Sequence, residues 1–138
     1  MTANEITSAV FHMTGSQVEG VLKDWPSDQW DARINDQTMS AKEVVAHLTE
    51  CCLAFQKSAK GEQHEWGTYV PADTSVEGLL ATMRAERAAC GAMLASANDD
   101  QLKEAFMYIH THDAYHVGQL VSLRLTLNPE WNSYAIYE

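Results

Sequence analysis

The chain has 138 residues, of which 46% are hydrophobic, a composition typical of a folded globular protein rather than a disordered one. The chain has nine Lys and Arg against 19 Asp and Glu, so its net charge is −10. A chain this acidic is not expected to bind nucleic-acid backbones or anionic membrane surfaces. Length and charge together predict one domain over residues 1–138 that binds neither nucleic acid nor membranes.

Cysteine usage and the N-terminal segment bear on the compartment. Cys51 and Cys52 are adjacent, and Cys90 makes the number odd, which is not the pattern of a disulfide framework. The first residues lack the basic and apolar regions of a secretory signal, and no stretch is apolar enough to predict a membrane span. By elimination, we expect a cytoplasmic protein.

Two helices are predicted in the first half of the chain. Apolar residues three or four positions apart predict a helix over residues 6–23, which ends before Pro26. The sequence SAKE forms a capping box, in which Ser40 is the N-cap and Glu43 reaches back to it. Apolar residues at helical spacing follow over residues 44–55. The capping box therefore predicts the start of the second helix.

Two more helices are predicted in the second half. Residues 57–73 contain two glycines and a proline without strand alternation, so they predict a long loop. A second capping box, with Thr74 as N-cap and Glu77 three residues later, precedes a helix over residues 76–94. The last helix is expected over residues 102–127. The fold class is thus all-α, a four-helix bundle, whose helix order stays open because the long loop permits a crossover.

The stretch HTHDAYHVGQ, residues 110–119, holds three of the six histidines. Positions four apart on a helix lie on the same face, so His112 and His116 are expected to point together into the bundle, whereas His110 points elsewhere. Two readings remain open for the pair. The imidazoles either hydrogen-bond to core carbonyls and carboxylates, or bind a divalent metal ion.

A third nitrogen ligand is available on the second helix. His47 lies on the side of that helix that must pack, and with His112 and His116 it completes three imidazole donors. Three protein ligands leave a coordination position open for water or substrate, which is typical of catalytic zinc sites. Cys51, four residues after His47, is either a fourth ligand that would close the site or a small core residue.

Two segments carry a resemblance to a known family. SAKEVVAHLTE, residues 40–50, and HDAYHVGQL, residues 112–120, resemble the two signatures of the DinB-like superfamily, whose members include metal-dependent enzymes such as thiol-dependent transferases and isomerases. The resemblance implies an up-down-down-up bundle, a homodimer, and a zinc or nickel ion held by His47, His112 and His116. It also implies a small-molecule substrate, with a low-molecular-weight thiol as one candidate.

Three residues beside the histidine pair carry further expectations. Asp113 is expected either to orient a ligand imidazole or to be a solvated surface carboxylate. Gln119 either bonds to water or substrate or is an ordinary polar helix residue. Gly118 lowers helix stability by about 1 kcal/mol relative to alanine, so we expect a close helix approach there.

Three functional hypotheses follow. The first is a metal-dependent transferase or hydrolase with an open coordination position. The second is a non-catalytic metal-binding or stress-associated helical module, which a Cys51 ligand would favour. The third is a helical interaction protein whose buried histidines hydrogen-bond without metal. Trp66 and Tyr69 of the long loop are expected to line a pocket or to cover the end of the bundle, and His12 and His64 are expected to lie outside the site.

Overall fold

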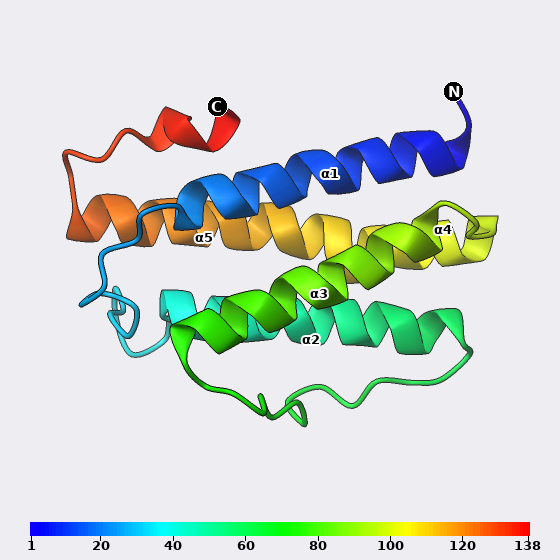
Figure 1. The fold of residues 1–138 in the computed structure, drawn as a ribbon, viewed down its shortest axis with the longest axis horizontal. Helices are drawn as coiled ribbons and strands as arrows, with labels where there is room; N and C mark the ends of the chain where they lie inside the picture. The colour runs from blue at the N-terminus through cyan, green and yellow to red at the C-terminus, as the bar shows by residue number, and fades with distance from the viewer.

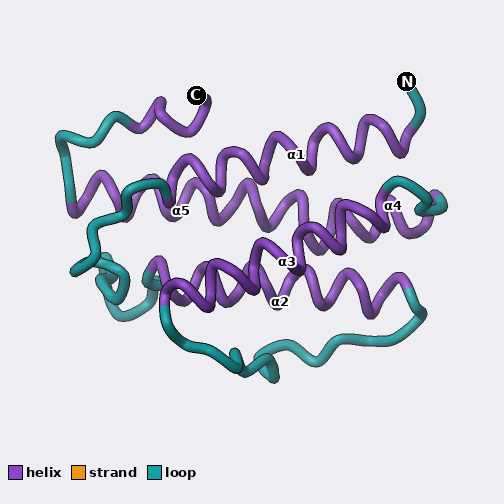
Figure 2. Tube along the Cα trace, in the orientation of Figure 1, coloured by secondary structure: helices purple, strands orange, loops and turns teal.

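The computed structural model describes residues 1–138, and it contains helices and loops without strands (Figure 2). The helices are α1 (Ala3–Leu22), α2 (Ala41–Ala59), α3 (Val76–Leu94), α4 (Asp99–Ala105) and α5 (Thr111–Leu127). A π-helical turn, Phe106–His110, joins α4 to α5, so these elements form one long fourth helix. The all-α four-helix prediction is confirmed. None of the helices combines the length and apolarity that a membrane crossing requires.

The helices follow the up-down-down-up order that the family resemblance implies (Figure 1). Helix α1 runs along the bundle in one direction, α2 and α3 both run in the opposite direction, and the α4–α5 helix returns parallel to α1. The parallel pair needs a crossover, and residues 60–75 supply it along the length of the bundle. This loop begins three residues later than predicted, because α2 continues to Ala59.

Side-chain N-caps decide where α2 and α3 begin. The Ser40 hydroxyl accepts the N–H of Glu43 at 3.2 Å, and the Glu43 carboxylate accepts the N–H of Ser40 at 2.8 Å, as predicted. The prediction of a capping box at the start of α3, with Thr74 as the N-cap and Glu77 three residues later, was wrong. Ser75 is the N-cap, because its hydroxyl reaches the N–H three positions later at 3.0 Å.

The fourth helix begins earlier than predicted and is not uniformly α-helical. Asn98 caps it, so it starts at Asp99 rather than at Leu102. The π-helical turn Phe106–His110 has one extra residue per turn, which the regular apolar spacing on either side does not reveal. The histidine pair lies immediately after this turn.

A buried arginine fastens α5 to the end of α1. The Arg124 guanidinium donates to the carbonyls of Val21 and Lys23, both at 2.7 Å, and to that of Asp24 at 3.1 Å. These carbonyls lie in and just after the last turn of α1, which carries no basic residue of its own. Arg124 therefore supplies the cation that favours a helix C-terminus.

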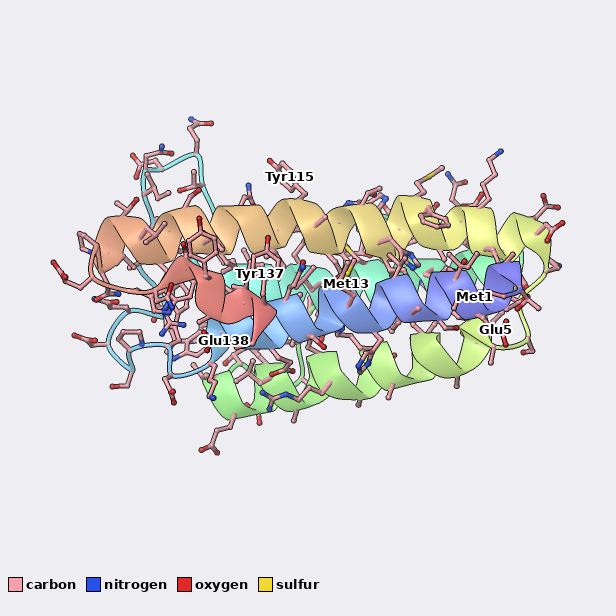
Figure 3. The ribbon with its side chains drawn as sticks, turned by 90° about the horizontal axis from the view of Figure 1, so that it is seen from above. Met1, Glu5, Met13, Tyr115, Tyr137 and Glu138 are labelled. Carbon is pink, nitrogen blue, oxygen red and sulfur yellow. The ribbon has the colours of Figure 1, made fainter.

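Two apolar clusters form the core on either side of the histidines. The larger joins α1, α2, α3 and α5, and the smaller joins the opposite ends of the helices with α4. The C-terminal 3₁₀ helix, Ser133–Tyr137, lies along α1 (Figure 3). Packing of both clusters fixes the rotation of α2 relative to α5, and so fixes which side chains of the two helices face each other.

Candidate metal centre

Three imidazoles converge between α2 and α5. The ring centroid of His47 lies 5.7 Å from that of His112 and 4.8 Å from that of His116. The rings of His112 and His116 are 6.1 Å apart and nearly parallel, with 16° between their planes, as expected for side chains one helical turn apart. The structure thus brings together the three histidines that the sequence singled out.

Cys51 belongs to the same cluster. Its Sγ lies 3.6 Å from Nε2 of His47. One potential ligand atom from each of His47, Cys51 and His112 lies within 4.8 Å of the other two. The cluster therefore offers sulfur as well as nitrogen donors to a metal ion.

Hydrogen bonds orient the two rings on α5. Nδ1 of His112 lies 3.0 Å from the carbonyl oxygen of Met107, in the π-helical turn. Nδ1 of His116 lies 2.7 Å from the side-chain oxygen of Gln119. Oxygen atoms of this kind only accept, so both rings carry their proton on Nδ1 and leave the Nε2 lone pair free. Metal-binding histidines usually have this arrangement.

A buried carboxylate links His47 to the crossover loop. Glu50 Oε2 lies 4.0 Å from Nδ1 of His47. Its other oxygen accepts hydrogen bonds from Nε2 of His64 and from the N–H of Gly67, both at 2.8 Å. The prediction that His64 lies apart from the site therefore needs correction, because His64 and Gly67 attach the loop to the helix that carries His47.

The same loop places an aromatic ring over the histidines. The ring of Trp66 stacks on His112 at 5.8 Å and on Tyr108 at 6.1 Å, and it contacts His47 at 5.9 Å and His64 at 4.9 Å. Of the two aromatic residues that the sequence singled out in this loop, Trp66 reaches the candidate site. It covers one side of the imidazole cluster.

Burial favours the neutral form of two of the imidazoles. It lowers the pKa of His116 to about 4, and repulsion from His47 and His112 acts in the same direction. Burial and then the nearby His112 also lower the pKa of His47. Burial raises the pKa of the Cys51 thiol to about 12, assisted by the negative charges of Asp113 and Glu50. The imidazoles of His47 and His116 are therefore ready to bind a metal, whereas the Cys51 thiol must first lose a proton.

Asp113 has neither of the roles expected of it. Its side chain is buried, and its two oxygens accept hydrogen bonds from Arg87 of α3 at 2.7 and 2.8 Å. The hydroxyl of Thr14 on α1 donates to it at 2.7 Å. One residue along a helix is a rotation of about 100°, so Asp113 points away from His112 toward α1 and α3. It neither orients a ligand imidazole nor faces solvent.

The neighbouring expectations also change. The sequence predicted that Gln119 either bonds to water or substrate or is an ordinary polar helix residue. In the structure, its side-chain oxygen instead orients the ring of His116. No helix approaches Gly118 closely, since a Cβ built there would meet no atom within 4 Å. His110 lies outside the cluster as predicted, with its two ring nitrogens 2.9 and 3.0 Å from main-chain carbonyls.

A cleft of about 670 Å³ reaches the imidazoles from the side opposite the core. Its walls are Gln37, Met39, His47, Thr111, His112, Tyr115, His116 and Gln119. Tyr115 projects outward from α5 at the mouth of this cleft (Figure 3). A small molecule can therefore reach the free nitrogens without rearrangement of the bundle.

Comparison with protein families identifies the scaffold. The family model described as the DinB superfamily matches residues 11–122, which include His47 and the HDAYHVGQ segment. The chain belongs to the DinB superfamily. This confirms the resemblance seen in the two sequence segments. No curated protein and no solved structure matches the chain.

Proposed function

We propose that this DinB superfamily chain is a metal-dependent enzyme in which His47, His112 and His116 hold one divalent ion with a coordination position open to the cleft. The convergence of three imidazoles from two helices, two of them with Nδ1 hydrogen-bonded to an oxygen acceptor, carries the proposal. Imidazole nitrogens suit zinc and nickel. A bound ion would supply Lewis acidity and lower the pKa of a thiol or water in the cleft.

In this proposal, the residues around the ion orient its ligands, shield it from water or contact the substrate. Gln119 and the carbonyl of Met107 hold the two rings of α5 in place. Trp66 keeps water from the loop side of the cluster, so that substrate enters through the cleft. The Tyr115 hydroxyl, which accepts a hydrogen bond from Gln119 at 3.1 Å, has its own proton to offer a substrate oxygen.

The reaction class is a thiol-dependent transfer or a hydrolysis. Both use the same three ligands and the same open position, and the thiol reaction rests on the family resemblance alone. The proposed setting, also taken from the resemblance and from the composition, is a cytoplasmic homodimer that acts on a small molecule.

A second candidate is a non-catalytic metal-binding module, which one observation favours. The Sγ of Cys51 is close enough to His47 and His112 to occupy a fourth coordination position. Four protein ligands would close the site and give the ion a structural role. Against this, the raised pKa of Cys51 makes the loss of its proton costly.

Metal content tests the proposal directly. Untagged protein is loaded with Co²⁺, dialysed and analysed by inductively coupled plasma mass spectrometry. We expect about one ion per chain, lost in His47→Ala and in His112→Ala but kept in His12→Ala, a matched control because His12 is exposed on α1. Equal losses in all three variants, or no uptake by the wild type, would refute histidine ligation. In Cys51→Ala, retention of the ion favours the enzyme, and its loss favours the closed structural site.

A further inference from the structure

The cleft over the histidines continues along α5. A second hollow of about 410 Å³ shares three wall residues, Met39, Tyr115 and Gln119, with the first. Its remaining walls are Ile34, Thr38, Gly118, Ser122 and Leu123. The two hollows form one elongated groove, which we name the α5 groove, with the imidazoles at one end and the connector between α1 and α2 along its side.

The two ends of the α5 groove differ in chemistry. Beside the histidines, Gln37 and Thr111 offer amide and hydroxyl groups. At the far end, Ile34, Met39 and Leu123 form an apolar wall, and the first two are exposed to solvent. Exposed apolar side chains gathered around a hollow mark a surface that binds something apolar. The groove therefore suits a molecule with a polar head and an apolar tail.

Charge further limits what the groove takes. No Lys, Arg, Asp or Glu lines either hollow. The chain as a whole carries a net charge of −10. A carboxylate or phosphate in the tail of a ligand would find no cation to pair with and would meet an unfavourable field.

Gly118 lies in the floor of the far end. It is within a helix, where glycine is less stable than alanine, and its φ is not in the left-handed region. No neighbouring atom would lie within 4 Å of a Cβ there. Neither backbone conformation nor helix packing therefore requires glycine at this position. The absence of a side chain leaves the groove open next to His116 and Gln119.

We infer that the substrate of this site is an elongated molecule with an uncharged apolar tail, whose head reaches the three histidines and whose tail lies over Gly118 against Ile34 and Leu123. The inference rests on the proposed function for the position of the head. It adds the substrate class, which the three histidines alone do not specify.

Straight-chain thiols test the inference. Co²⁺-loaded protein is titrated anaerobically with ethanethiol, butanethiol and hexanethiol, and binding is followed by the visible absorption of Co²⁺. We expect the Kd to fall by about fourfold for each methylene that enters the groove. Hexanethiol should also bind more tightly than 6-mercaptohexanoate, which has the same length but ends in a carboxylate.

Two variants connect this dependence to the groove. Gly118→Leu fills the far end, so it should abolish the dependence on chain length while Co²⁺ uptake stays at the wild-type level. Ile34→Ala, in the opposite wall, should weaken hexanethiol severalfold and leave ethanethiol unchanged. Because Ile34 lies in the connector between α1 and α2, this second substitution does not change α5 or its histidines.

The outcomes separate the two proposals. Failure of the wild type to take up Co²⁺ would refute the proposed function. Three results with normal Co²⁺ uptake would overturn the inference about the tail and leave the metal site standing. They are equal affinity for all thiols, no thiol binding, or a dependence of Kd on chain length that stays unchanged in both variants.

Discussion

Replacement of Asp113 by Asn should destabilise the bundle strongly. The Asp113 carboxylate accepts two hydrogen bonds from Arg87 and one from Thr14, so it joins α5 to α3 and α1. The side chains of Asp113 and Arg87 are only 2% and 11% exposed. Asn preserves the shape of the side chain but removes its charge, which leaves a largely buried guanidinium without a counter-ion.

The expected cost follows from this burial. Removal of one partner of a buried ion pair typically lowers the free energy of unfolding by about 3–5 kcal/mol. For a chain of this size, each kcal/mol lowers Tm by roughly 3 °C, so Asp113→Asn should melt about 9–15 °C below the wild type. The double variant Arg87→Met with Asp113→Leu removes both charges and should regain most of the lost stability.

Urea unfolding of the metal-free proteins, followed by circular dichroism at 222 nm, measures these differences. A loss below about 1 kcal/mol in Asp113→Asn, or a double variant no more stable than the single one, would refute the ion-pair argument. Folded Asp113→Asn should still bind Co²⁺ with unchanged affinity. A large loss of affinity in the folded variant would instead restore the role of Asp113 as a group that orients His112.

Three further predictions concern the candidate metal centre. Gln119→Leu should weaken metal binding by about 10–100-fold in competition with a chelator, because His116 loses its Nδ1 acceptor, whereas Gln119→Glu should retain binding. The pKa of His116, at about 4, and the pKa of His47 both lie below the ordinary histidine value. Metal affinity should therefore change little from pH 8 to about pH 7, and should fall at lower pH as protons compete for the nitrogens. A steep loss of affinity between pH 8 and pH 7 in a chelator titration would contradict this. Co²⁺ binding should quench the fluorescence of Trp66, which stacks on the site, so Trp66→Phe should lose most of the quenching and Trp131→Phe should keep it.

The helices could be predicted because their signals are local. Apolar spacing and the Ser40 capping box act over a few residues, and they place α2 within a residue of its observed start. The up-down-down-up order came from the resemblance, because a loop of this length connects parallel and antiparallel helices equally well. The π-helical turn left no trace in the sequence, since FMYIH has the composition of an ordinary helix.

The candidate site was predictable to the extent that it depends on helix geometry. The spacing of His112 and His116 alone places them on one face, but the approach of His47 depends on how α2 packs against α5. Asp113 was misjudged because its partners, Arg87 and Thr14, lie 26 and 99 residues away in the chain. Loop residues have no period, so nothing local linked His64 to a carboxylate on α2.

The π-helical turn Phe106–His110 amounts to one residue inserted into an otherwise regular helix. An insertion in an α-helix would rotate everything beyond it by about 100°, and the wide turn absorbs that rotation. Deletion of the solvent-exposed Met107 should yield an unbroken helix with both faces preserved, at the expense of the carbonyl that orients His112. A change in the length of the helix at this position therefore also changes the hydrogen bond that orients His112.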